Sequence, residues 1–311
     1  MTLVTFLLPV YNGEKYLEEA LKSLEAQTYK DFEVLIINDG STDRTQEIIN
    51  DFNSRDSRFK YISRENRGLI ETLNEGLETI QTKYIARMDA DDICHEKRLE
   101  LQIQYMEENP HIGISGTNLR FFGDDEFDYC YSTDDQELKA GILLRPPFGH
   151  PSVIMRKELV EKHKLRYDFN FKDCEDYKLW LDMADVTTFG NVPQTLFYYR
   201  KHGESVSDRS KIQHQKSQLV RQIALSKLNV SQNTIRFHLD LCARRYNTIQ
   251  LEYWPIYLGE FKQLGHSYLK IGFGQLKSFC QLYLPRDHAE QFYNCVKDSV
   301  FAMDNELVAQ N

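Results

Sequence analysis

The sequence predicts an α/β protein with a doubly wound, mostly parallel sheet and a helical C-terminal region. Short apolar runs alternate with segments of helical periodicity over roughly the first 200 residues, which is the pattern of βαβ units. Polar clusters follow three of the apolar runs, as they do at the ligand-binding edge of such sheets. A chain of 311 residues is long enough for two domains. We expect these domains at residues 1–205 and 206–311.

Strands and helices are expected in strict alternation along the first domain. The run Leu3–Leu8 is apolar throughout, as in a strand buried on both faces, and Pro9 is expected to end it. Asn12 is expected to cap the first helix, and Thr42 or Asp43 the second. Further strands are expected at residues 32–37, 59–62, 84–86 and 112–117 and within 148–155, and helices around residues 17–24, 48–52, 69–80, 97–109 and 175–183.

The three polar clusters are Pro9–Asn12, Asn38–Ser41 and Asp89–Asp91. The carboxyl ends of parallel strands lie along one edge, so these clusters are expected to meet in one crevice. The turn after the first strand lacks both the dinucleotide-binding and the P-loop glycine patterns, which disfavours a dehydrogenase or a P-loop enzyme. If the crevice binds a nucleotide diphosphate, its charge has to be neutralised by other means. Carboxylates that hold a metal ion would do this.

The segment Arg87–Asp92 carries three carboxylates within four residues. Like charges at this spacing repel each other, so a folded protein keeps them only where something offsets the charge. One interpretation is a site for Mg²⁺ or Mn²⁺, because hard cations take carboxylate oxygens together with substrate phosphates. The other is a solvated acidic turn that caps a helix starting near Glu96. The segment alone leaves both open.

Composition narrows the class of protein. The net charge of −9 argues against general nucleic-acid binding. Six scattered cysteines without a Cys-x-x-Cys pair suit reduced thiols in a cytoplasm. The N-terminus has no basic segment before its apolar run, and no apolar run approaches the roughly 18 residues of a spanning helix. We expect a soluble, cytoplasmic protein.

Five motifs in this order resemble the family 2 glycosyltransferases, which have the GT-A fold. They are Leu8–Asn12, Ala26–Tyr29, Glu33–Asp43, Glu65–Leu69 and Asp89–Asp92. The resemblance extends over residues 3–205, and the combination is more specific than any single motif. It implies a nucleotide-sugar donor, with UDP as the preferred nucleotide, a divalent metal (Mn²⁺ or Mg²⁺) and inversion at the anomeric carbon.

The resemblance also implies roles for individual residues of the donor site. Pro9 and Tyr11 would line the base and ribose pocket, with Arg67 also at the donor, and Asp39 would accept a hydrogen bond from the base. Many relatives have a second acid where this chain has Asn38, so no role is assigned to Asn38. For the metal site it implies Asp91 as ligand, Asp89 between ribose and metal, and His202 as an additional ligand.

Two further segments carry candidate residues. Glu175 and Asp176 open a predicted helix, where acids are favoured by the helix dipole alone. By resemblance, Asp176 is the general base that deprotonates the acceptor hydroxyl, and Glu175 orients the acceptor or the base. His150 is expected to be structural rather than a sugar contact. Arg200 or Lys201 would meet the diphosphate, unless they are simply solvated.

The C-terminal region differs in composition. Residues 200–250 hold ten Lys or Arg against three Asp or Glu, a local net charge of +7. Aromatic residues and lysines alternate from Tyr253 to Tyr283, which favours packed helices, while contact with an anionic acceptor or the inner membrane surface stays an alternative. The expected function is sugar transfer to a glycan or lipid-linked saccharide in surface polysaccharide synthesis. A nucleotidyltransferase and a non-catalytic sugar-nucleotide or glycan-binding protein are the alternatives.

Overall fold

The computed structural model describes residues 2–203, 210–244, 249–284 and 286–308. The domain boundary expected between residues 205 and 206 lies outside these ranges. The chain divides into two compact units, one formed by Met1–Lys139 with Pro146–Lys216 and the other by Ala140–Arg145 with Ser217–Asn311.

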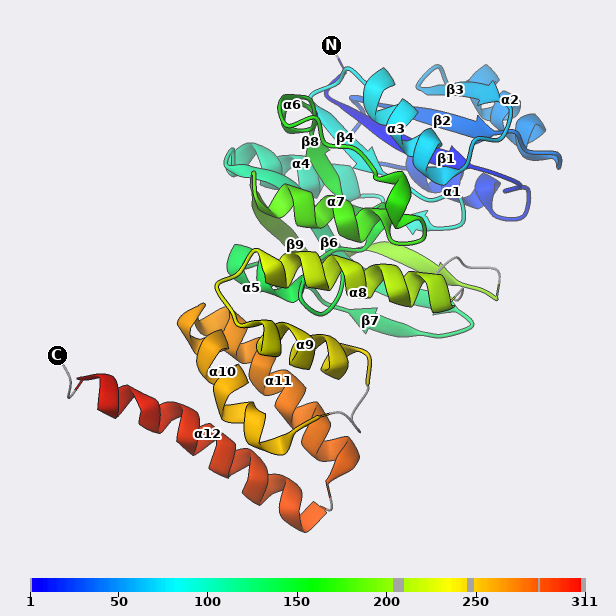
Figure 1. The fold of residues 1–311 in the computed structure, drawn as a ribbon. Coiled ribbons are helices and arrows are strands. Elements are labelled where there is room, and N and C mark those ends of the chain that lie inside the picture. Colours follow the sequence, from blue (N-terminus) through cyan, green and yellow to red (C-terminus); the bar gives the residue numbers. More distant parts are fainter. Residues whose placement is uncertain (1, 204–209, 245–248, 285, 309–311) are drawn as a thin grey trace. The chain divides into compact units, whose positions relative to one another are not determined.

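The first unit is built on a nine-stranded sheet with the order β3-β2-β1-β4-β8-β6-β9-β5, and β7 pairs with β6 (Figure 1). Strands β3, β2, β1 and β4 are parallel, whereas β8 runs antiparallel to both β4 and β6. The α/β prediction is therefore confirmed, with a parallel half followed by a mixed half. The strands are β1 (Val4–Val10), β2 (Phe32–Asp39), β3 (Phe59–Arg64), β4 (Tyr84–Arg87), β5 (Ile93–Cys94), β6 (Ile112–Gly123), β7 (Phe127–Tyr129), β8 (Ile154–Arg156) and β9 (Thr188–Lys201).

Helices cover both faces of this sheet. Successive side chains of β1 point to opposite faces and all are buried, so each face needs a layer of helices over it. Phe6 and Leu8 join one core cluster with Leu21. Leu7 points the other way, onto Gly76 of α3, where an added Cβ would lie 2.1 Å from the leucine Cδ1. The helices are α1 (Leu17–Glu25), α2 (Thr45–Arg55), α3 (Leu69–Thr79), α4 (Arg98–Glu108), α5 (Asp135–Gly141), α6 (Lys157–Lys162) and α7 (Glu175–Ala184).

Pro9 does not end β1, which continues to Val10. Leu7 and Pro9 both direct their backbone N and O atoms towards β4. On that side the Leu7 carbonyl accepts a hydrogen bond from the N–H of Met88, the residue after β4. The pairing with β4 stops at Leu7, so Pro9 faces a position where no ladder donor is required. Its missing N–H is therefore tolerated inside the strand.

Asn12 does not cap the first helix, which begins at Leu17. Its φ is 51°, and its side chain accepts from the Thr42 N–H (2.9 Å), which ties the loop after β1 to the loop after β2. The cap expected from Thr42 or Asp43 is also displaced, because α2 begins at Thr45 with Arg44 at the N-cap position. The Asp43 carboxylate still accepts from the first N–H of this helix, at 3.0 Å.

The second unit is helical, and aromatic side chains fill its core. Trp254, Tyr257 and Phe261 are each 0% exposed, which confirms the interpretation of these aromatics as packed helix cores. No helix in the described part of the chain is both long and apolar enough to cross a bilayer. The helices are α8 (Ser210–Ser226), which starts in the first unit, and α9 (Gln232–Cys242), α10 (Trp254–Gln263), α11 (His266–Tyr283) and α12 (Arg286–Val308).

The short segment Ala140–Arg145 belongs to this helical unit. The Leu143 carbonyl accepts from Nε2 of the buried His238 (2.9 Å), and the Leu144 carbonyl accepts from the Arg221 guanidinium (2.6 Å). Side chains of α8 and α9 thus donate hydrogen bonds that hold residues 140–145, which lie far away in sequence.

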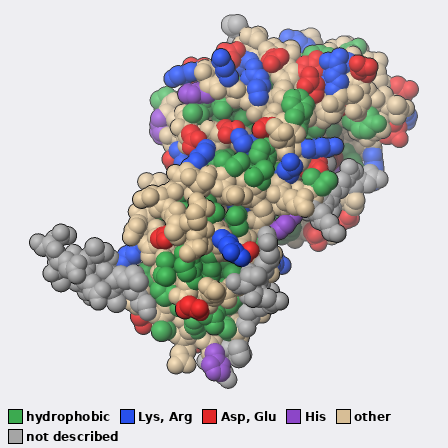
Figure 2. Space-filling model, in the orientation of Figure 1, with side chains coloured by type: hydrophobic (Ala, Val, Ile, Leu, Met, Phe, Trp, Pro, Cys, Tyr) green, Lys and Arg blue, Asp and Glu red, His purple; other side chains and the backbone are tan. Residues whose placement is uncertain are grey.

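Figure 2 shows acidic and basic side chains interspersed over the visible face of the first unit.

Candidate active site

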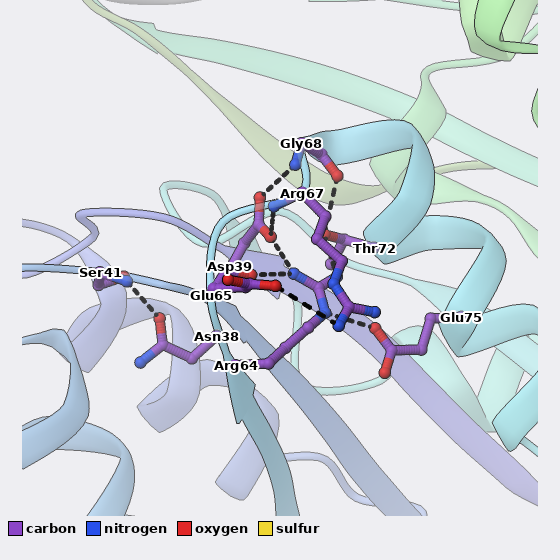
Figure 3. A network of polar contacts seen from close by, with 9 residues as sticks. All are labelled: Asn38, Asp39, Ser41, Arg64, Glu65, Arg67, Gly68, Thr72 and Glu75. Atoms are coloured by element: carbon purple, nitrogen blue, oxygen red, sulfur yellow. Dashed lines mark hydrogen bonds and ion pairs between the residues drawn. The ribbon is translucent and has the colours of Figure 1, made fainter.

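Asp39, at the end of β2, is the centre of a buried polar network (Figure 3). Its carboxylate is 4% exposed and accepts from the backbone N–H groups of Arg67 (2.8 Å) and Gly68 (2.9 Å). It also forms an ion pair with Arg64, whose guanidinium donates to Glu75 (2.7 Å). A buried carboxylate is retained only with such partners. The loop before α3 is therefore fixed onto the end of β2.

Glycine is required on both sides of this contact. Gly40 has φ +75°, and a Cβ there would lie 2.5 Å from the Asn66 nitrogen. Gly68 has φ +88° and supplies one of the two N–H donors to Asp39. The predicted donor residues Asp39 and Arg67 are thus brought together through the backbone of Arg67, whose side chain stays exposed.

The two other predicted donor residues lie at the end of β1. Pro9 is buried in the strand, and Tyr11, just beyond it, is 55% exposed. The next residue, Asn12, binds Ser41 and Thr42, at 2.9 Å each, in the loop that follows Asp39. The ends of β1 and β2 are therefore joined, as the sequence predicts, and Tyr11 offers a ring face to solvent beside them.

The three carboxylates after β4 have three different partners. Asp89 pairs with Arg87 (2.6 Å), and Asp91 Oδ2 lies 2.9 Å from His202 Nε2. Asp92 is 1% exposed and accepts from the Arg200 N–H at 2.7 Å. The alternative that this acidic turn caps the next helix is wrong, because α4 begins only at Arg98 and Asp92, the last of the three acids, binds β9 instead.

Arg200 holds the acidic loop from the side of β9. Its guanidinium donates to the Asp91 carbonyl (2.7 Å) and to Glu19 of α1 (2.5 Å), and the side chain is 14% exposed. The alternative that Arg200 is a solvated surface residue is therefore wrong. Because these contacts fix the loop, the Asp91 carboxylate and the imidazole of His202 face each other.

A buried cation lies beneath the acids. Arg87 is 1% exposed, and its Nε has no hydrogen-bond partner among the described residues. Burial, with help from the Asp91 carboxylate, raises the pKa of Asp89 against the opposing effect of Arg87. Burial and the neighbouring carboxylates of Asp91 and Asp89 raise the pKa of Asp92 well above its ordinary value. Arg87 offsets only part of the charge.

The potential ligand atoms at this loop fit a divalent metal ion. Asp91 is 37% exposed and meets His202 at hydrogen-bond distance, so one oxygen and one nitrogen ligand converge on accessible space. In the described part of the chain, no three His, Cys, Asp or Glu side chains form a metal-binding cluster. Two protein ligands are compatible with Mg²⁺ or Mn²⁺, which often complete their shell with water and substrate phosphates.

Glu175 and Asp176 form the first turn of α7, as predicted. Burial, and then the charge of Asp176, raise the pKa of Glu175 to about 7. Burial raises the pKa of Asp176 to about 6; the Tyr177 N–H, which donates to its carboxylate at 2.7 Å, opposes this, and the charge of Asp89 adds to it. Asp176 is therefore electrostatically coupled to the acidic loop although 87 residues separate it from Asp89 in sequence.

His150 is a structural residue, as expected. Its Nε2 is 2.9 Å from the hydroxyl of Tyr167, and its ring packs edge-on against Trp180 of α7. Burial lowers the pKa of His150 well below its ordinary value, so the ring is neutral. The side-chain amide of Asn74 in turn holds the backbone of Tyr167: its NH₂ group donates to the Tyr167 carbonyl and its oxygen accepts from the Tyr167 N–H, at 2.9 Å each.

Sequence reasoning assigned no role to Arg87, Tyr167 or Tyr199. The hydroxyl of Tyr167 binds His150, and the carboxylates of the acidic loop and Asp176 all act on Tyr199. One signal was available: an arginine directly after the apolar run Tyr84–Ala86 has to be buried, and a buried arginine requires a carboxylate partner.

Replacing Glu175 with Gln is expected to stabilise the protein at pH 8 but not at pH 4. Between pH 4.5, the ordinary pKa of this carboxyl group, and pH 7, the folded protein keeps a proton that the unfolded chain releases. The unfolding free energy of the wild type therefore falls as the pH rises through this window. The amide is neutral at every pH and avoids this loss of unfolding free energy, which is about 3 kcal/mol. Urea unfolding at both pH values measures it. An equal change in unfolding free energy at both would contradict the expectation.

Comparison with known proteins points to one family. The model of Glycosyl transferase family 2 matches residues 5–162. An uncharacterized glycosyltransferase of Haemophilus influenzae is 33% identical over 245 residues, and the match covers 75% of each chain.

Solved structures agree in fold. S. aureus TarS in complex with UDP-GlcNAc superimposes with a TM-score of 0.64 at 18% identity, over 96% of this chain and 91% of the TarS chain. A mannosyltransferase of Pyrobaculum calidifontis, solved with GDP-Man and Mn²⁺, gives a TM-score of 0.50 at 16% identity, over 94% and 79% of the two chains. These neighbours confirm the predicted fold class.

Proposed function

The chain belongs to glycosyl transferase family 2, and we propose that it is an inverting enzyme that transfers a sugar from a nucleotide-diphosphate sugar to an acceptor hydroxyl. One observation supports this most. A second pair of carboxylates, Glu175 and Asp176, stands at the start of α7 outside the acidic loop, and the charge of Asp89 in that loop helps to raise the pKa of Asp176. A protein that only bound a sugar nucleotide would not require this second pair.

The donor is proposed to lie between the ends of β1 and β2. The Asp39 carboxylate accepts three hydrogen bonds, two on one oxygen and one on the other. A lone pair therefore remains to accept an N–H of the nucleotide base. The exposed ring of Tyr11 and the buried Pro9 would line the same pocket, with Arg67 at its rim. A UDP-linked sugar is the preferred donor, supported by the UDP-GlcNAc complex of TarS.

Asp91 and His202, with Asp89 beside them, are proposed to hold Mn²⁺ or Mg²⁺. When bound, the cation would supply positive charge that stabilises the leaving diphosphate. The mannosyltransferase neighbour solved with Mn²⁺ supports this assignment. Arg200 keeps the loop in place through the Asp91 carbonyl, and Arg87 balances the charge of Asp89.

Asp176 is proposed as the general base. It would accept the proton of the acceptor hydroxyl as that oxygen attacks the anomeric carbon from the face opposite the diphosphate. Its raised pKa, about 6, makes it a stronger base than an ordinary aspartate while leaving it ionised at neutral pH. Glu175 would orient the acceptor or Asp176.

The acceptor class is proposed from the resemblance to the family. It would be a glycan or lipid-linked saccharide of surface polysaccharide synthesis. Association with the inner membrane surface rests on the net charge of +7 over residues 200–250.

A thermal-shift screen of UDP-, GDP- and dTDP-sugars tests the donor and the metal together. One nucleotide class is expected to raise Tm by a few degrees with Mn²⁺ present and to lose this effect with EDTA, because ligand binding stabilises the folded state by mass action. The same donor should be hydrolysed slowly when no acceptor is added. Stabilisation without hydrolysis or transfer from any donor would favour a binding protein instead.

A further inference from the structure

The ring of Tyr16 packs against His202, the residue that faces Asp91. The centroids of the tyrosine and imidazole rings are 5.1 Å apart, and their planes meet at 42°. Tyr16 stands directly before α1 and is partly buried. Its N–H donates to the Gly13 carbonyl and its carbonyl accepts from the Ala20 N–H, at 3.1 Å each. The ring is therefore attached to a fixed point of the backbone.

The same ring contacts Arg200. The guanidinium carbon of Arg200 lies 4.5 Å from the Tyr16 centroid, and the guanidinium also donates to the Asp91 carbonyl (2.7 Å) and to Glu19 (2.5 Å). Glu19 follows Tyr16 by three residues, in the first turn of α1. The start of α1 thus contacts Arg200 through two side chains, and Arg200 in turn holds the acidic loop.

His202 depends on side-chain contacts for its orientation. The pairing of β6 with β9 ends at Gly123 and Lys201, so His202 stands one residue beyond the last paired position. Strand pairing fixes the direction of the Arg200 side chain but does not extend to the imidazole of His202. Its Nε2 lies 2.9 Å from Asp91 Oδ2, a contact that a rotation of the imidazole would break.

Packing of cations on the ring is the simpler role for Tyr16. Arg200 lies over it, and so does Lys15, whose Nζ is 4.7 Å from the centroid. Such contacts stabilise many surface aromatics and imply no function. The contact with His202 is different, because it joins the ring to a proposed metal ligand. Side chains that orient a metal-binding histidine change metal affinity when they are replaced.

We propose that Tyr16 is a positioning residue of the metal site, whose ring holds the imidazole of His202 in the orientation that brings Nε2 to Asp91. This inference rests on the proposed function, because it deepens the assignment of His202 as a metal ligand. Within the described residues the Tyr16 hydroxyl has no hydrogen-bond partner, so the flat ring makes these contacts and the hydroxyl is not required.

Binding of Mn²⁺ tests the inference without turnover. EPR measures the free Mn²⁺ in the presence of UDP and, separately, of GDP, with no sugar donor or acceptor added. Tyr16→Leu removes the flat ring but keeps an apolar side chain, and Tyr16→Phe keeps the ring. Tyr61→Leu is the matched control, because Tyr61 is 40% exposed on the edge strand β3. Thermal unfolding without Mn²⁺ checks that each variant is folded.

Tyr16→Leu is expected to raise the Kd for Mn²⁺ about tenfold, whereas Tyr16→Phe and Tyr61→Leu should bind as the wild type does. His202→Ala should raise the Kd by at least as much. In the His202→Ala background, Tyr16→Leu should cause no further loss, because a residue that acts through His202 then has no imidazole to orient.

The inference is overturned if Tyr16→Leu binds Mn²⁺ as tightly as the wild type while His202→Ala binds it more weakly; the proposed metal site then stands. It is also overturned if Tyr16→Leu weakens binding equally with and without His202, since the ring would then act through Arg200 and the acidic loop. Failure of the proposed metal site gives a different result. His202→Ala would bind Mn²⁺ as the wild type does, or the wild type would bind none, and the inference would fall with it.

Discussion

Replacing Asp176 with Asn is expected to lower kcat for sugar transfer by about 10²–10⁴-fold, the range that a general base contributes. The amide cannot accept the proton of the acceptor hydroxyl, yet it has nearly the same volume and its oxygen can still accept from the Tyr177 N–H. Donor affinity should change little, since no donor contact is assigned to this residue. In the wild type, kcat should fall as the pH drops through about 6, where the base becomes protonated.

Asp182→Asn is the matched control for this variant. Asp182 lies on the same helix, α7, and its partly exposed carboxylate pairs with Lys178 at 2.6 Å. Loss of that pair costs about 0–1 kcal/mol of stability and should leave kcat unchanged. Near-normal turnover by Asp176→Asn, measured as nucleoside diphosphate release, would remove Asp176 from the mechanism.

Replacing Asp91 with Asn is expected to lower kcat by at least about 10²-fold and to raise the Mn²⁺ concentration needed for half-maximal activity. The variant loses the charge of the proposed metal ligand, while its amide oxygen can still meet His202 and its carbonyl still binds Arg200. The fold should therefore remain intact. Activity assays over a Mn²⁺ titration, together with the unfolding midpoint, measure both expectations.

Asp125→Asn controls for the simple loss of a negative charge. Asp125 is exposed in the turn between β6 and β7, and its replacement should alter neither activity nor metal dependence. A Mn²⁺ dependence that is the same for Asp91→Asn and the wild type would rule out Asp91 as the metal ligand.

Sequence patterns predicted the fold well because its signals are local. Apolar runs, helical periodicity and a glycine at a turn each depend on neighbouring residues, so most strands and helices of the first unit appear close to their expected places. The caps were less predictable. Asn12 has the side chain of a helix cap, but a contact with Thr42, 30 residues away, determines its conformation. The strand that continues through Pro9 likewise depends on where its neighbour β4 ends.

The candidate site divides in the same way. Its acids could be identified from the sequence because they follow strand ends and a helix start. The residues that hold them could not, because their bonds join distant segments: Arg200 and Asp92 are 108 residues apart, and Arg200 and Glu19 are 181 apart. Asp92 shows the consequence, since its neighbours suggest a cap whereas its partner is the backbone of β9.

The segment Ala140–Arg145 restricts how this protein can be recombined with its relatives. Its carbonyls are bound by His238 and Arg221, so it is part of the helical unit although it is encoded within the first unit. A chimera joined at a single point near Lys216 would therefore combine two helical-unit fragments of different parentage. Grafting the whole helical unit from a relative would have to move Ala140–Arg145 together with Ser217–Asn311.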